Sequence, residues 1–75
     1  MKGSVPVMDT ITTILDVKAL LRRFGIVIYM GSPLADYEIW EDELRELYME
    51  KLITVEEFRQ AMAVIQRAKI PYLGT

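Results

Sequence analysis

Between residues 34 and 48, apolar side chains recur every three or four positions, and acidic side chains fill most of the positions between them. This period is typical of an amphipathic helix that turns one face towards a core. Ser32 and Pro33 precede the repeat and suit the N-cap and the first helical position. We therefore predict a helix from Pro33 to about Glu50. Its apolar stripe comprises Leu34, Tyr37, Trp40, Leu44, Leu47 and Tyr48.

A shorter helix is predicted to precede it, beginning at Thr13, whose hydroxyl can accept a hydrogen bond from the backbone N–H three residues on. Asp16 lies in its first turn, where negative charge complements the helix dipole. Gly25 is expected to end the helix, because glycine adopts a positive φ without steric cost. The expected buried residues are Ile14, Val17, Leu21 and Phe24.

A third helix is predicted to begin at the sequence Thr54-Val55-Glu56-Glu57, which has the spacing of a capping box. Ile70-Pro71 is expected to end it, since a residue that precedes proline avoids helical backbone angles. Its expected buried residues are Val55, Phe58, Ala61, Met62, Ile65 and Ala68.

The β-branched run at residues 26–30 prefers an extended backbone, yet no second strand is evident to pair with it. We interpret it as an extended connector packed over the helices or as a continuation of the first helix, with a strand-swapped dimer as a further alternative. The chain is therefore predicted to be an all-α three-helix bundle over residues 13–70. Residues 1–12 are expected to form a flexible arm, and residues 71–75 a tail.

Composition narrows the possible functions. The 75 residues suffice for one domain, and a hydrophobic content of 52% argues against intrinsic disorder. Neither cysteine nor histidine occurs, which excludes histidine-dependent triads and the usual zinc sites. We therefore expect a protein without catalytic activity or cofactor. No apolar run is long enough for a signal peptide or a membrane span, so a cytoplasmic location is predicted.

The exposed side of the second helix is strongly acidic, with seven carboxylates and one arginine between residues 36 and 50. Glu41 and Arg45 have the spacing of an ion pair. The ridge of Glu38, Asp42, Glu46 and Glu50 could hold a hard cation, but such spacing is ordinary on a solvated helix. We predict a solvated face and no metal site.

Basic residues flank the first and third helices: Lys18, Arg22, Arg23, Arg59, Arg67 and Lys69. They could follow a phosphate backbone, with Tyr29 and Tyr72 as stacking faces for bases. The other interpretation is that they neutralise the acidic second helix across the bundle. Single-stranded nucleic-acid binding is thus an alternative function.

Three apolar residues, Ile39, Met49 and Val64, fall outside the main stripes of their helices. Exposed apolar residues that group together mark docking surfaces, so these three are the predicted interaction residues, and Ile39 and Met49 are expected to be substantially exposed. The aromatic residues Trp40, Tyr37 and Tyr48 are expected in the core instead. We predict a non-catalytic interaction module that binds a protein partner or a second copy of itself.

Several runs resemble one known family: Gly25, Ile28-Tyr29, Gly31, Ala35-Asp36 and above all the acidic block from Glu41 to Tyr48. The chain is similar over roughly residues 15 to 69 to the YqgQ-like family of small uncharacterised bacterial proteins. The resemblance implies a three-helix bundle, for which single-stranded nucleic-acid binding has been suggested. It implies no catalytic residue.

Overall fold

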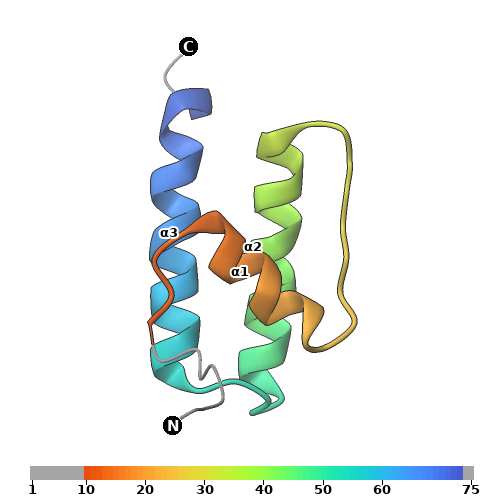
Figure 1. Ribbon diagram of the computed structural model, residues 1–75, viewed down its shortest axis with the longest axis vertical. Coiled ribbons are helices and arrows are strands. Elements are labelled where there is room, and N and C mark those ends of the chain that lie inside the picture. The colour runs from red at the N-terminus through yellow and green to blue at the C-terminus, as the bar shows by residue number, and fades with distance from the viewer. Residues whose placement is uncertain (1–9, 74–75) are drawn as a thin grey trace, which may run out of the picture.

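The computed structural model describes residues 10–73, which form three helices and no strand. These are α1 (Ile14–Arg22), α2 (Pro33–Met49) and α3 (Val55–Leu73). Helices α2 and α3 run antiparallel side by side, and the short α1 lies across both of them (Figure 1). The predicted all-α three-helix bundle is thereby confirmed.

The start of α1 is fixed by hydrogen bonds, of which the sequence predicts the one accepted by the Thr13 hydroxyl. The Thr13 hydroxyl accepts the N–H of Asp16 at 3.2 Å, and the Asp16 carboxylate accepts the N–H groups of Thr12 and Thr13 at 3.0 and 3.1 Å. These bonds to the charged carboxylate lower the pKa of Asp16. Gly25 follows the helix with φ 77°, as expected for a residue that ends a helix.

The core draws on all three helices. Its buried apolar residues are Ile11, Val17, Leu20, Leu21, Trp40, Leu44, Leu47, Ile53, Ala61, Val64 and Ile65. Leu20 is buried although it lies outside the predicted stripe of α1. The reason is that α1 lies across two helices and so needs a wider apolar face than a helix with one neighbour. Ile11 lies in the segment predicted to be a flexible arm, but its side chain is buried and its N–H donates to Gln60 Oε1 at 2.8 Å.

The buried face of α3 differs from its predicted stripe. Val64, predicted at the surface as an interaction residue, is only 5% exposed, because α1 and α2 both pack against α3 and widen its buried face. Val55, predicted in the core, is 58% exposed in the first turn of the helix, beside the α2–α3 turn. Tyr48 was also predicted in the core, but its ring is exposed and stacks on Phe58 with ring centroids 4.7 Å apart.

Helix α3 continues past the predicted stop at Ile70 and includes Pro71. A proline inside a helix removes one backbone hydrogen bond. The helix tolerates Pro71 because α3 ends two residues later, at Leu73. The ring of Tyr72 lies edge-on to Tyr37 at 6.2 Å between centroids, which holds the last turn against α2. Part of the predicted tail is therefore helical. Residues 1–9 of the predicted arm and 74–75 of the tail lie outside the described residues.

The connector at residues 26–30 is extended, which confirms that interpretation over a continued first helix. It lies between Gly25 and Gly31, both with positive φ, and runs along α2 from the end of α1 to the start of α2 (Figure 1). Ile26 and Ile28 pack against the core, whereas Val27 and Tyr29 point outwards. The alternation gives this unpaired segment one buried face without a ladder of strand hydrogen bonds.

Ser32 occupies the predicted N-cap of α2 and Pro33 its first position, but the Ser32 side chain makes no capping hydrogen bond. The carboxylate of Asp36 in the first turn instead accepts the N–H of Met30 at 2.6 Å. This bond ties the end of the connector to α2.

Candidate binding surfaces

A buried ion pair joins α2 to α3 and removes one predicted nucleic-acid residue from the surface. Lys69 Nζ donates to Glu41 Oε1 at 3.1 Å, and Gln66 Nε2 donates to Glu41 Oε2 at 2.6 Å. The Lys69 side chain is only 13% exposed and Glu41 is buried. The predicted pairing of Glu41 with Arg45 is wrong, because Glu41 turns inwards and Arg45 pairs with Asp42 at 2.8 Å.

Two more of the six basic residues are paired with carboxylates at the surface. Arg59 contacts Glu56 at 2.5 Å, and this contact lowers the pKa of Glu56. Arg23 reaches Glu57 at 3.5 Å. Within residues 10–73, only Lys18, Arg22 and Arg67 of the six lack a carboxylate within 4.0 Å. Glu56 and Glu57 belong to α3, so Lys69 is the one residue of the six that pairs with a carboxylate of α2 among the described residues, and the neutralising interpretation describes that residue alone.

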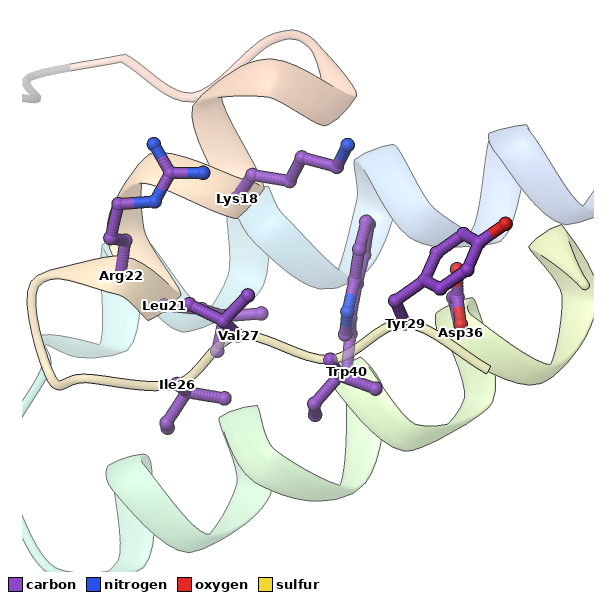
Figure 2. Close-up of a pocket in the computed structure, with 9 residues that line it drawn as sticks. Lys18, Leu21, Arg22, Ile26, Val27, Tyr29, Asp36 and Trp40 are labelled. Carbon is purple, nitrogen blue, oxygen red and sulfur yellow. The ribbon is translucent and has the colours of Figure 1, made fainter. Parts of the chain in front are cut away.

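The structure brings Lys18 and Arg22 together on a pocket of about 160 Å³ between α1, the connector and α2. We call it the connector pocket. Figure 2 shows Lys18 and Arg22 extending from α1 on one side and Trp40 rising from α2. Lys18 Nζ lies 5.9 Å from the centre of the Trp40 ring, within reach of a cation–π interaction. The lining residues are Lys18, Leu21, Arg22, Ile26, Val27, Ile28, Tyr29, Asp36 and Trp40.

The opposite side of the connector pocket carries the Asp36 carboxylate and the Tyr29 ring (Figure 2). Tyr29 is 85% exposed, as a stacking residue requires, whereas Tyr72 packs against Tyr37. Neither Asp36 nor Trp40 was predicted to belong to a binding site. The alternation of inward and outward side chains in the connector was the one sequence signal that one of its faces packs on α2. No short sequence pattern indicates that α1 also lines the pocket.

A second surface lies where α2 turns into α3. Tyr48, Met49, Leu52 and Val55 are exposed there, and we call this group the end patch. A shallow hollow beside it is lined by Tyr48, Met49, Lys51, Leu52, Ile53 and Thr54. Met49 is 77% exposed, as predicted. Ile39 is half-buried and Val64 is buried, so Met49 alone of the predicted interaction residues belongs to the end patch.

The turn beside the end patch holds its chain in an unusual conformation. Lys51 has φ 64°, and it is the one non-glycine residue of the described chain with a positive φ. The N–H of Lys51 donates to the Tyr48 carbonyl at 3.0 Å, and the N–H of Leu52 donates to the Leu47 carbonyl at 2.9 Å. These bonds satisfy carbonyls at the end of α2 and project Leu52 outwards.

The acidic ridge of α2 does not gather into a ligand set. Across the residues that the structure describes, no group of three or more acidic side chains lies close enough to hold a metal ion. Nor is any helix in this part of the chain long and apolar enough to cross a membrane.

This architecture places the chain among small all-α proteins whose core is formed by three helices. The YqgQ-like family matches residues 11–70, so the chain belongs to that family, as the sequence resemblance predicts. The chain is 40% identical over 55 residues to the Uncharacterized protein YqgQ of Bacillus subtilis (strain 168). The match spans 73% of this chain and 78% of that relative.

Proposed function

We propose that the protein is a non-catalytic interaction module whose end patch docks a protein partner. The observation that carries the proposal is the grouping of four exposed apolar side chains around one helix turn, with a hollow beside them. Single exposed apolar residues are common on any protein, but grouped ones cost solvation free energy unless something covers them.

The charges around the end patch favour a partner with basic side chains. Glu46 in the last turn of α2 and Glu50 just after it flank Met49, and neither carboxylate has a basic group within 4.0 Å in the described chain. Lys51 lines the hollow, so these three charges leave this surface net negative. Two copies that met through this patch would bring together two net negative surfaces, with two carboxylates for each Lys51, which is unfavourable. A different protein that offers apolar side chains beside lysine or arginine would satisfy both features.

The test compares capture of partners from cell extract by the tagged protein and by two double variants. Met49→Glu with Leu52→Glu places charge in the end patch and is expected to reduce a specific captured protein at least tenfold. Ile70→Glu with Leu73→Glu is the matched control, because it changes two exposed apolar residues at the opposite end of α3. Equal loss in both variants, or in neither, would contradict the proposal.

Self-association is the outcome to separate from this one, and sedimentation of the purified protein measures it directly. The proposal expects a monomer at micromolar concentration. A dimer that Met49→Glu with Leu52→Glu dissociates would replace the partner with a second copy of the chain.

Single-stranded nucleic-acid binding is a second candidate, supported by the exposed Tyr29 ring beside Lys18 and Arg22, which have no carboxylate within 4.0 Å among the described residues. A positive groove with a stacking face is the usual arrangement for such binding. Fluorescence anisotropy of labelled single-stranded RNA and DNA tests it at low and at physiological salt. Binding that Lys18→Glu with Arg22→Glu abolishes would support it, and no binding even at low salt would exclude it.

A further inference from the structure

The connector pocket places the charged side chains of Lys18, Arg22 and Asp36 beside apolar residues of the core, and docking at the end patch uses none of them. We propose that it binds a small ligand with a single ring, one carboxylate and a hydrogen-bond donor at the opposite end of the ring. The proposal is independent of the end patch, which belongs to the other end of α2.

The apolar side chains of the pocket indicate that the central part of the ligand is an apolar ring. Leu21, Ile26 and Ile28 form its apolar walls beside the indole of Trp40. A cavity of about 150 Å³ lined by apolar groups holds one benzene-sized molecule. The connector pocket, at about 160 Å³, therefore has room for one ring.

The cations set the charged end of the ligand. Lys18 and Arg22 are four residues apart on α1, so they are neighbours on one helix face and repel each other. Neither has a carboxylate within 4.0 Å in the part of the chain that the structure describes. A carboxylate placed between them would relieve the repulsion and accept charge-assisted hydrogen bonds from both.

Asp36 indicates that the other end of the ligand carries a hydrogen-bond donor, and its charge disfavours ligands with several negative groups. Its Oδ1 accepts the Met30 N–H, and its Oδ2 accepts no hydrogen bond from the described residues. An ionised carboxylate only accepts hydrogen bonds, so Oδ2 would accept one from a hydroxyl or amine of the ligand. The negative charge of Asp36 would repel a second negative group on the ligand. The pocket thus has a cationic side and an acceptor side, with an apolar floor between them.

The protein contains a single tryptophan, so the indole N–H signal of Trp40 reports directly on the pocket. We would titrate 4-hydroxybenzoate into isotope-labelled protein and follow this signal by NMR. Benzoate lacks the donor, and 4-hydroxybenzamide lacks the charge. The proposal predicts saturable shifts with 4-hydroxybenzoate, weaker binding of benzoate and the weakest binding of the amide.

Substitutions locate the binding. Lys18→Gln and Arg22→Gln should each weaken 4-hydroxybenzoate about three- to tenfold, since each removes one partly solvated charged contact. Arg67→Gln is the matched control, because Arg67 has no carboxylate within 4.0 Å in residues 10–73 and does not line the pocket. Met49→Glu with Leu52→Glu should leave this binding unchanged, which separates this proposal from docking at the end patch.

Three results would overturn the proposal. One is the absence of saturable shifts up to about 10 mM ligand, an affinity too weak for a built site. Another is equal binding of the acid and the amide. The third is tighter binding of a nucleoside monophosphate or an oligothymidylate that is lost in Lys18→Gln, which would assign the pocket to phosphate.

Discussion

The buried pair of Glu41 and Lys69 yields the sharpest stability prediction. Replacing Lys69 by methionine keeps most of the side-chain volume but leaves a buried carboxylate with Gln66 as its one remaining partner. Removing one partner of a buried ion pair typically costs about 3 kcal/mol or more. For a domain of this size, about 3 kcal/mol lowers the melting temperature by about 12–24 °C.

The double variant Glu41→Leu with Lys69→Met should recover most of that loss, to within about 1 kcal/mol of the wild type, because an apolar pair needs no desolvated charge. Gln66 is exposed and regains a hydrogen bond from water. Glu41→Leu alone should cost less than Lys69→Met, since the long lysine side chain can carry its ammonium group to water. A coupling of about 2 kcal/mol between the two positions is therefore expected.

Urea unfolding followed by far-ultraviolet circular dichroism and by Trp40 fluorescence measures all four proteins. Sucrose can be added equally to each if Lys69→Met is too unstable for a native baseline. Arg45→Met is the matched control, because the Arg45–Asp42 pair is exposed and should contribute no more than about 0.5 kcal/mol. A cost below about 1 kcal/mol for Lys69→Met would refute the assignment of the pair as buried and stabilising.

Three further predictions concern the helix ends and the buried face of α3. Val64→Ala should cost about 2 kcal/mol and Val55→Ala less than about 0.5 kcal/mol in urea unfolding, and equal costs would contradict the burial assigned to Val64. Lys51→Gly should raise the free energy of unfolding by up to about 1 kcal/mol by relieving the positive φ, and a loss would contradict strain there. Asp16 has a pKa below its ordinary value of 3.8, so its stabilisation is present above that pH and is lost as the pH falls through the lowered pKa. Stability in acid should therefore fall less steeply in Asp16→Asn than in the wild type.

The helix starts could be predicted because their determinants are local. Thr54 and Glu57 form the reciprocal hydrogen bonds of the predicted capping box, and the Thr13 hydroxyl accepts the predicted hydrogen bond from the N–H of Asp16. Gly25 likewise adopts the positive φ expected of it. Each of these features depends on a few neighbouring residues, so no knowledge of the packing is needed.

The inward faces could not be predicted in full, because they depend on how the helices lie against one another. The burial of Leu20 and Val64 follows from α1 lying across α2 and α3. Glu41 looks like a surface residue in the sequence, and only the packing of α2 on α3 places Lys69 within 3.1 Å of it.

The candidate sites also contain residues that could be predicted from local sequence and residues that only the packing brings together. Met49 was predicted from its place off the stripe, but its neighbours Leu52 and Val55 depend on the geometry of the turn at Lys51. Lys18 and Arg22 were predicted among six basic residues as nucleic-acid contacts. Their meeting with Trp40 and Asp36 depends on the path of the connector, which no local pattern specifies.

Photo-crosslinking from the end patch tests the central proposal most directly. A benzophenone side chain in place of Leu52, in cells that express the protein, should form a covalent adduct with a second protein. The adduct should be lost when Met49→Glu is added, and benzophenone at Ile70, an exposed apolar position at the far end of α3, should not form it. Identical adducts from both positions, or none from residue 52, would contradict docking at the end patch.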